Sequence, residues 1–523
     1  MIGRQRTWVY LVALGVISAV SRLPQLLSPN LFLDGDECTL GLMAKHVAQG
    51  KELPIFFYGQ HHGLSTVEAV AGAISFITVG VGAVPLKVAM LVLWTLGVLF
   101  LFLAQSTLLG PRKSFWISSV LLLNPAWAVW SMKARGGYIT AFTATAALLW
   151  LLGHDRERRS RNGERHSQDK ASHAVVRWLV AGALTTIIFL AQPLWLPGVL
   201  PIAAAALISR RRVSCALGYA GMMAAGFLLV RQSGGPPVGN PDPVGSLPGL
   251  AQQIYVNLTG SYYLFWPIDP PGPVTKVLAV AWCGLLAATV LMQLYRLLTR
   301  RYCWSSHLLF LSVSSTLIAE WLLLRPRDPR YLLPMSAPLV LLAGIEIVDL
   351  VDRRLLSKRI AVGFTLTALL LGSVSIHEFR AFNFLWPNAP NGLSEARRMR
   401  QVLSYLKVRD VGHVFSMNGL LEWQLMFYSN EQVLARFPYE NDRYLPYVVE
   451  VNRALENGKP IAVVGYTNAS GAPGCWDVPI CTGGIENIVP NPESTFTVDG
   501  KYFIYAGADR ELLEKLQFRF PDE

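Results

Sequence analysis

The sequence predicts an all-α polytopic membrane domain followed by a small α/β domain outside the membrane. Hydrophobic residues make up 52% of the 523-residue chain and charged residues 15%, and the mean hydropathy is +0.37. These values are typical of a chain with many membrane spans. Long apolar stretches recur up to residue 377 and stop there. We therefore divide the chain into a membrane domain, 1–377, and a C-terminal domain, 378–523.

The net charge of +12 does not indicate nucleic-acid binding. Most basic residues fall in short loops between apolar stretches, and no recognisable nucleic-acid module accompanies them. This is the pattern of the positive-inside rule, by which Lys and Arg gather in cytoplasmic loops. The first apolar segment has no small-residue cleavage site and many similar segments follow it, so we interpret it as a retained helix.

Length and hydropathy indicate the spans, because a membrane-spanning helix needs roughly 20 apolar residues. One further apolar stretch, residues 64–84, contains Thr66, Glu68 and glycines, and counting it as a span would divide the basic loops between both sides. We expect residues 64–80 to form a helix in the outer membrane interface instead. About eleven spans remain, at residues 8–27, 87–109, 114–131, 137–152, 177–192, 194–209, 213–231, 274–297, 306–324, 332–350 and 360–377.

This assignment places six basic clusters on one side of the membrane. They predict a multi-pass protein of the cell (inner or plasma) membrane, with the N-terminus cytoplasmic and the C-terminal domain extracytoplasmic. The clusters are Arg4/Arg6, Arg112/Lys113, the run from Arg156 to Arg177, Arg210–Arg212, Arg296–Arg301 and Arg353–Arg359.

The C-terminal domain has the periodicities of an α/β fold. We expect helices at 395–407 and 447–457 and strands at 413–417 and 460–466. Residues 495–505 alternate around Asp499-Gly500, which predicts a hairpin. Cys475 and Cys481 lie close together in a Gly/Pro-rich loop, and outside the cytoplasm such a pair predicts a disulfide. The six cysteines show no metal-ligand spacing.

Three acids follow the first span at the predicted outer surface. Asp34, Asp36 and Glu37 lie within four residues, before a helix that we expect over 37–49. Acids at such a boundary are often only solvated loop residues. As a functional group, a carboxylate such as Asp36 could deprotonate an acceptor hydroxyl.

Basic residues on the outer side run against the positive-inside pattern. Lys133 and Arg135 lie in the second external loop, and Arg325, Arg327 and Arg330 in the fourth. Each could snorkel to lipid head groups. Five cations in two short loops favour an anionic ligand at the membrane surface instead, because Arg binds phosphate oxygens in a fork geometry and the glycines beside Arg135 would admit backbone N–H groups.

Acids and cations at one membrane surface suit transfer from a lipid-linked sugar phosphate. The phosphate would lie on the arginines and the lipid tail between helices. Asp36 could then activate an acceptor hydroxyl for attack at the anomeric carbon. One base suffices if arginine already neutralises the leaving phosphate.

The motifs also occur in a characteristic order. The Asp-Glu pair follows the first span, and Tyr58-Gly59-Gln60, Gly63 and Glu68 come next, before Lys133–Tyr138 and Arg330–Pro334. This order resembles the GT-C membrane glycosyltransferases, in particular bacterial relatives of protein O-mannosyltransferases and of the aminoarabinose transferase of lipid A (family 39-like). The resemblance covers roughly residues 5–380, and the C-terminal domain matches in position only.

The resemblance implies an inverting glycosyltransferase that uses a polyprenyl-phosphate sugar. On that pattern Asp36 is the general base, Glu37 is its neighbour, and Arg330 and Tyr331 contact the lipid phosphate, with Arg135, Arg327 and Lys133 as further cations. Relatives often carry an acid in the second external loop, where this chain has none. Asp269, Asp328 or Glu320 could replace it, or the acceptor needs no second acid.

Further candidates could line the substrate pocket. Glu320 lies within a span and is functional by default, or it pairs with an arginine of the fourth loop. His61 and His62 could bind a divalent metal with Asp36, but adjacent histidines are more often surface or acceptor-site residues, so we assign no metal and no other cofactor. The pocket candidates are Asp34, Tyr58, Gln60, His61, His62, Glu68, Tyr138, Asp269 and Glu320.

Two other functions compete with the enzyme. A transporter or flippase of a lipid-linked saccharide is the main alternative, but transporters tend to have internal repeats and charges at the bilayer midplane, which are not evident here. A non-catalytic assembly or sensor protein whose C-terminal domain binds glycans is the third class. We favour the glycosyltransferase, with the sugar and the acceptor (lipid, glycan or protein) left open.

Overall fold

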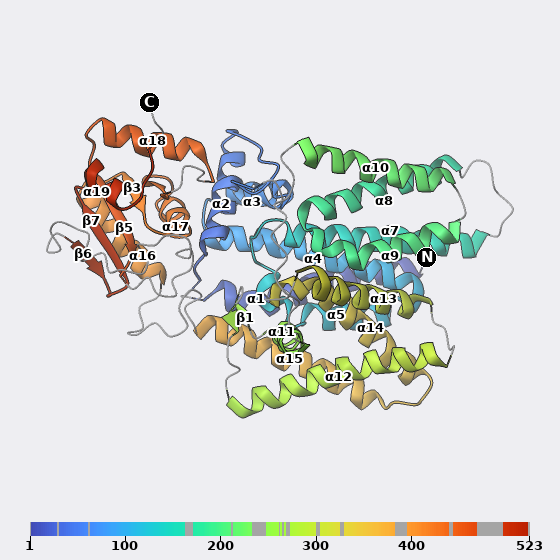
Figure 1. The fold of residues 1–523 in the computed structure, drawn as a ribbon. Helices are drawn as coiled ribbons and strands as arrows, with labels where there is room; N and C mark the ends of the chain where they lie inside the picture. Colours follow the sequence, from blue (N-terminus) through green and yellow to red (C-terminus); the bar gives the residue numbers. More distant parts are fainter. Residues whose placement is uncertain are drawn as a thin grey trace.

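The computed structural model describes residues 2–28, 31–60, 63–162, 171–210, 213–232, 247–260, 262–263, 266–267, 272–299, 304–324, 329–381, 395–438, 443–467 and 495–520. Its long helices form a bundle, and an α/β domain lies at one end of that bundle (Figure 1). Two helices of the predicted first external loop, α2 (Gly35–Ala48) and α3 (Thr66–Val79), lie between the bundle and the α/β domain.

Every range predicted to span the membrane holds a helix. The bundle helices are α1 (Ile2–Leu26), α4 (Ala83–Leu109), α5 (Pro111–Leu122), α7 (Tyr138–Asn162), α8 (Ala171–Ala191), α9 (Leu196–Arg210), α10 (Val213–Gln232), α12 (Gly272–Leu298), α13 (Trp304–Ala319), α14 (Leu333–Asp352) and α15 (Lys358–Ala381). Short elements join them, namely α6 (Trp127–Trp130), η1 (Pro193–Trp195), α11 (Leu247–Thr259), the hairpin β1 (Tyr262–Tyr263) and β2 (Trp266–Pro267), η2 (Glu320–Leu324) and η3 (Pro329–Leu332).

The predicted span at 114–131 is divided into two helices. The α5 helix ends at Leu122, and α6 begins after Asn124-Pro125. Proline cannot donate a backbone hydrogen bond to the preceding turn, and the Asn124 side chain accepts the backbone N–H of Ala126 at 3.2 Å. These two residues therefore stop α5 and start the short helix that leads to the second external loop.

Within the described residues, five helices are long and apolar enough to cross a membrane: Thr7–Leu26, Ala83–Leu109, Ala174–Ala191, Lys276–Leu298 and Pro329–Asp352. Shorter apolar helices lie at Thr66–Val79, Tyr138–Gly153, Pro193–Ile208, Val213–Leu228 and Ser306–Leu322. The chain is thus a multi-pass membrane protein by composition and fold, whereas the count of about eleven spans stays a prediction.

Several of the basic clusters meet at one end of the bundle. Lys113 pairs with Asp352, and Asp349 accepts from Arg296 at 2.7 Å and from Arg353 at 2.9 Å. These contacts join the ends of α5, α12 and α14. The N-terminus lies away from the C-terminal domain in Figure 1, as expected if the basic end is cytoplasmic and the C-terminal domain is outside.

A labelling experiment tests this orientation. Cysteines introduced at Arg353 and at Arg453 of the C-terminal domain have similar access to solvent, since the native side chains are 61% and 62% exposed. We expect an impermeant thiol reagent to label position 453 in intact cells and position 353 only after the membrane is opened. Labelling of the parent chain, which lacks both introduced cysteines, gives the background signal. Labelling of position 353 in intact cells would overturn the predicted topology.

The C-terminal domain contains a five-stranded mixed sheet in the order β4-β3-β5-β7-β6. The strands β4 and β5 are parallel to β3, and β7 is antiparallel to β5 and β6. The elements are α16 (Glu395–Val408), β3 (His413–Ser416), α17 (Leu421–Tyr428), β4 (Leu434–Arg436), α18 (Leu445–Glu456), β5 (Ile461–Tyr466), β6 (Thr495–Val498), β7 (Tyr502–Ala506) and α19 (Arg510–Lys515).

The predicted elements of this domain are confirmed, including the hairpin. Asp499 and Gly500 have positive φ angles of 52° and 61°, as the central residues of a type I′ turn do, and the backbone N–H of Lys501 donates to the Val498 carbonyl at 3.0 Å. The helix α17 was not predicted. Residues 421–427 are all buried, so α17 lacks the polar face that makes an amphipathic helix recognisable.

Candidate active site

The acid motif forms the beginning of helix α2. Asp34 is the N-cap, where its carboxylate accepts the backbone N–H of Glu37 at 2.9 Å, and the Glu37 carboxylate accepts the backbone N–H of Asp34 in return. This capping box satisfies two donors at the helix N-terminus. The helix therefore begins at Gly35, two residues before the predicted start at Glu37, because the motif Asp-x-x-Glu itself supplies the cap.

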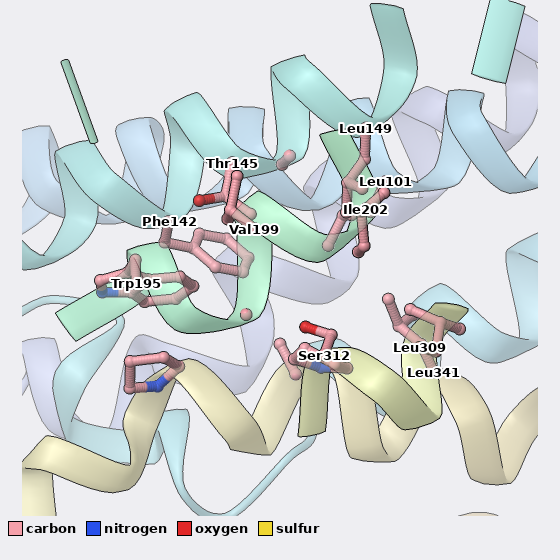
Figure 2. Close-up of a pocket in the computed structure, with 15 residues that line it drawn as sticks. Leu101, Phe142, Thr145, Leu149, Trp195, Val199, Ile202, Leu309, Ser312 and Leu341 are labelled. Carbon is pink, nitrogen blue, oxygen red and sulfur yellow. The ribbon is translucent and has the colours of Figure 1, made fainter. Parts of the chain in front are cut away.

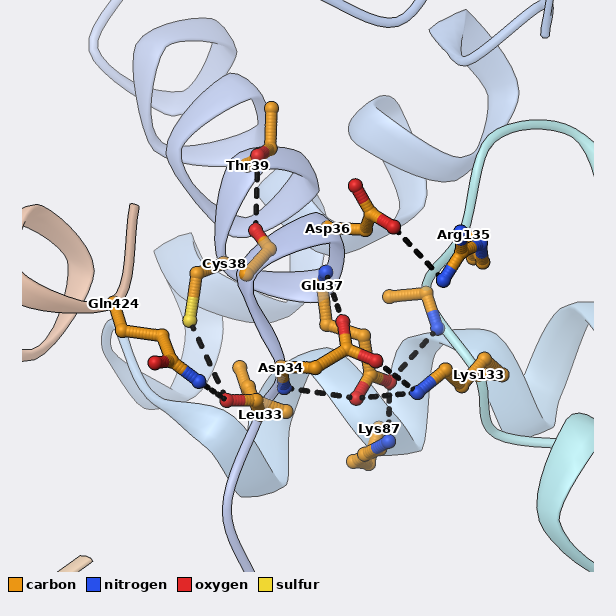
Figure 3. Close-up of polar contacts among 12 residues, drawn as sticks. Leu33, Asp34, Asp36, Glu37, Cys38, Thr39, Lys87, Lys133, Arg135 and Gln424 are labelled. Atoms are coloured by element: carbon orange, nitrogen blue, oxygen red, sulfur yellow. Dashed lines mark hydrogen bonds and ion pairs between the residues drawn. The ribbon is translucent and has the colours of Figure 1, made fainter. Parts of the chain in front are cut away.

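Two of the acids are neutralised by buried lysines (Figure 3). Lys133 pairs with Asp34 and, at 3.3 Å, with Glu37, while Lys87 of α4 pairs with Glu37. All four side chains are at most 3% exposed. The backbone N–H of Ala134 also donates to Glu37 at 3.1 Å. We call Asp34, Glu37, Lys87 and Lys133 the inner cluster. It fixes the predicted second external loop against α2 and leaves Lys133 buried.

Asp36 points away from the inner cluster (Figure 3). Its Oδ2 atom lies 2.8 Å from Nη1 of Arg135, and its Oδ1 atom accepts from Nη1 of Arg443 at 2.8 Å. Burial alone would raise the pKa of Asp36, but the guanidinium groups of Arg135 and Arg443, with a smaller contribution from Arg330, hold it well below its ordinary value. Asp36 is therefore an ionised carboxylate among arginines.

The contact with Arg443 was not predicted. Arg443 precedes α18 in the C-terminal domain, 407 residues from Asp36 in sequence. No motif surrounds Arg443, and basic residues are common in soluble domains. The contact arises because α17 packs on the acid motif. The side chain of Gln424 donates to the Leu33 carbonyl at 2.9 Å, and the Tyr428 hydroxyl accepts the Leu33 backbone N–H at 2.8 Å.

The predicted fourth external loop contributes Arg330 and Tyr331, which come just before α14. Both lie in η3, and the Arg330 guanidinium lies 5.2 Å from the centre of the Tyr331 ring. The side chain of Asn257 in α11 donates to the Pro329 carbonyl at 2.7 Å, which holds this turn in place. Arg325, Arg327 and Asp328 lie outside the described residues.

An apolar pocket lies along α14, beginning at Pro334, the second residue of that helix (Figure 2). Residues at helical spacing on α14 form one wall, and aromatic and aliphatic residues of α7, η1 and α9 face them. Thr145 and Ser312 are its polar side chains. The α14 wall consists of Pro334, Ala337, Pro338 and Leu341, and Figure 2 labels Phe142, Trp195, Val199 and Ile202 opposite. The lining is therefore almost entirely apolar.

Glu68 has a structural contact. It is buried at the beginning of α3 and accepts both the backbone N–H and the hydroxyl of Thr140, each at 3.3 Å. These donors lie in the first turn of α7, so Glu68 caps that helix from a distance. Burial raises the pKa of Glu68 to about 7 in spite of these hydrogen bonds.

Tyr58, Gln60, Tyr138 and Glu320 do not contact Asp36 directly. The Tyr58 hydroxyl bonds to Glu52 and His46, and the Tyr58 ring stacks on Tyr444 at 4.6 Å. The backbone N–H of Gln60 donates to the Phe57 carbonyl. Tyr138 packs on Trp130 at 4.9 Å, and Glu320 is buried at the start of the π-helical turn η2. Outside the described residues lie His61, His62, Asp269, Cys475 and Cys481, so those assignments stay predictions.

Comparisons with protein-family models and with curated proteins give no match. Among solved structures, the chain is similar to ArnT from Cupriavidus metallidurans bound to undecaprenyl phosphate, with 14% identity, a TM-score of 0.56, and coverage of 95% of this chain and 98% of that chain. It is also similar to the oligosaccharyltransferase of Archaeoglobus fulgidus in the apo form, with 14% identity, a TM-score of 0.50, and coverage of 90% and 71%. The chain therefore has the same fold as these two membrane proteins, as the resemblance in motif order predicted.

Proposed function

We propose that this protein is an integral membrane glycosyltransferase that moves a sugar from a polyprenyl-phosphate donor to an extracytoplasmic acceptor with inversion. One observation carries the proposal. The buried, ionised Asp36 meets arginines from distant segments where the membrane bundle ends. An ion pair of this kind is expensive to desolvate and is typical of a site that binds charge.

The donor's two parts match two neighbouring surfaces. We assign its phosphate to Arg330 and Arg135, whose guanidinium groups can bind phosphate oxygens in a fork. We assign its isoprenoid tail to the apolar pocket along α14, which begins at Pro334, four residues after Arg330. The solved ArnT structure with undecaprenyl phosphate shares this fold and supports a lipid phosphate as the ligand.

Asp36 acts as the general base in this proposal. It takes the proton of the acceptor hydroxyl, whose oxygen attacks the anomeric carbon from the face opposite the phosphate. The bond from that carbon to the phosphate oxygen breaks, and the lipid phosphate leaves against arginine. A carboxylate held by arginines is a weak base, so a phosphate that competes for Arg135 would also raise the pKa of Asp36 and activate it.

Replacing Arg330 tests the donor site. We expect Arg330→Ala to weaken the binding of a polyprenyl phosphate by about 1–3 kcal/mol, the scale of a charge-assisted contact. Arg330→Lys should be impaired less, because it keeps the charge but loses the fork. Binding to the purified full-length protein in nanodiscs gives the measurement, and Arg453→Ala, at an exposed site on α18, is the control. Normal lipid-phosphate binding by Arg330→Ala with lost stability alone would place the donor elsewhere.

A further inference from the structure

We infer that Arg22 and Glu68 are positioning residues for Arg135, the cation that the proposed site shares between Asp36 and the donor phosphate. This inference rests on the proposed function and extends it to two buried side chains, of which sequence analysis left Arg22 out of the site. It follows from the atoms that these two charges bind, which lie at the two ends of the segment 131–140 that carries Arg135.

Arg22 is a buried cation near the end of α1. Its side chain is 1% exposed, and no carboxylate in the described part of the chain pairs with it. Instead, its Nη2 atom donates to the carbonyls of Leu122 at 3.0 Å and of Trp127 at 3.3 Å, and its Nε atom donates to the Ser131 hydroxyl at 2.8 Å. A guanidinium buried without a counter-ion is costly to desolvate, so these contacts need a reason.

The three acceptors of Arg22 mark the path from α5 to the predicted second external loop. Leu122 is the last residue of α5, Trp127 is the first of α6, and Ser131 directly follows α6. Carbonyls at the C-terminus of a helix have no partner within that helix, so the guanidinium supplies one. Arg22 therefore fixes the end of α5, the short helix α6 and the beginning of the segment 131–140 to α1.

The turn after α6 carries this position on to Arg135. The backbone N–H of Lys133 donates to the Trp130 carbonyl at 3.2 Å, which continues the turn to within two residues of Arg135. The Arg135 guanidinium then lies 2.8 Å from the Asp36 carboxylate (Figure 3). A shift of α6 against α1 would therefore strain or move the backbone that presents Arg135 to the acid.

Glu68 holds the other end of the segment. Its side chain is 0% exposed, and no cation among the residues that the structure describes pairs with it. Its Oε1 atom accepts the backbone N–H and the hydroxyl of Thr140, each at 3.3 Å. Thr140 lies in the first turn of α7, where backbone N–H groups have no partner within the helix. Arg22 and Glu68 thus bind the first and the last residue of the segment 131–140.

Two buried charges without counter-ions are an expensive way to cap two helices, because neutral polar groups would do so at a lower desolvation cost. Their common result is a fixed place for Arg135. The two glycines after it, Gly136 and Gly137, have φ angles of +33° and +86°, and their backbone freedom would otherwise leave Arg135 loosely placed. Accurate placement matters because a cation stabilises a growing phosphate charge only from a defined position.

A double-variant cycle tests whether Arg22 acts through Arg135. The readout is the preference of the full-length protein in nanodiscs for polyprenyl phosphate over polyprenol, because loss of folded protein affects both lipids alike. Arg135→Met should lower this preference by roughly 10- to 100-fold, the scale of a charge-assisted contact. Arg22→Met should lower it by roughly 3- to 30-fold as Arg135 becomes misplaced. The double variant should lower it no further than Arg135→Met alone.

Milder variants keep the test decisive if Arg22→Met does not fold. Ser131→Ala removes one acceptor and leaves every charge in place, so it should lower the preference in the same direction but by less. Arg22→Lys keeps the charge without the fork and should restore part of the preference. At the other end, Glu68→Gln keeps an acceptor oxygen for Thr140 and should resemble the parent, whereas Glu68→Met should behave like Arg22→Met.

Two serines of the same helices supply the controls. Ser18 lies one turn before Arg22 on α1, is 1% exposed, and shares a hydrogen bond of 2.6 Å with the Thr95 hydroxyl of α4. Ser75 of α3 donates to the Pro85 carbonyl at 2.9 Å. Ser18→Ala and Ser75→Ala remove hydrogen bonds that do not involve the second external loop, so both variants should keep the parent's preference.

Two results would overturn the inference while leaving the donor site intact. One is an unchanged preference in Ser131→Ala and in folded Arg22→Met, and the other is an equal further loss when Arg22→Met is added to Arg135→Met. A normal preference in Arg135→Met itself would instead remove Arg135 from the proposed donor site, and the inference would fall with it. The behaviour of Arg135→Met therefore distinguishes the two failures.

Discussion

Asp36→Asn should lower the rate of sugar transfer by about two to four orders of magnitude, the usual scale for loss of a general base. The variant should still bind the polyprenyl-phosphate donor, and bind it as tightly as the parent or more so, because Asn no longer competes with the phosphate for Arg135. Transfer of a labelled sugar and lipid-phosphate binding, measured on the same preparations, would separate these two effects.

Asp34→Asn is the control for this result. Asn is as good an N-cap as Asp, but it cannot neutralise the buried Lys133, so the expected loss is in stability. Near-normal transfer by Asp36→Asn would assign the base elsewhere, and Glu37 or Asp34 would have to be tested next.

The pH dependence of sugar transfer should also report on Asp36 as the general base. The base acts only when it is ionised, so activity falls as the pH drops through its pKa. In the free enzyme that pKa is well below the ordinary value for Asp, because Arg135 and Arg443 outweigh the effect of burial. With donor bound, the arginines are shared with phosphate and the pKa rises. The acid limb of kcat should therefore lie at a higher pH than that of kcat/KM for the donor.

Much of the fold follows from patterns that the sequence carries locally. Each apolar stretch of the membrane domain forms a helix, and alternation around Asp499-Gly500 identifies the hairpin. The departures occur where tertiary packing decides. The α17 helix is buried between the sheet and α2, so its sequence lacks the alternation of polar and apolar residues that identifies an amphipathic helix. The capping box moves the start of α2 to Gly35.

For the candidate site, too, local patterns identified some residues, whereas contacts that depend on tertiary packing were not predicted. The acid after the first span and the arginine of the second external loop do meet, as the pair Asp36–Arg135 shows. The spacing of the residues could not show that Lys133 is buried in the inner cluster while Arg135 pairs with Asp36. This difference depends on Lys87 of α4 and on the packing of α2. Nor could it find Arg443, whose contact with Asp36 depends on how a distant domain docks.

A large loss of stability is expected when the inner cluster loses one of its lysines. Lys133→Met should destabilise the protein by about 3–5 kcal/mol, because it leaves the carboxylates of Asp34 and Glu37 buried with one lysine instead of two. Arg135→Met should cost less stability than Lys133→Met, because Arg443 still pairs with Asp36, yet it should weaken lipid-phosphate binding. Unfolding in detergent and lipid-phosphate binding would be compared for both variants.

A second substitution tests whether Lys133 stabilises the protein by neutralising Asp34. Adding Asp34→Asn to Lys133→Met removes the uncompensated charge while keeping the N-cap, so the double variant should recover part of the lost stability. The opposite pattern is also informative. If Lys133→Met unfolds like the parent and loses only lipid-phosphate binding, then Lys133 reaches the donor, as its place beside Arg135 in the sequence suggested, and the buried lysine pair is not what holds the acid motif in place.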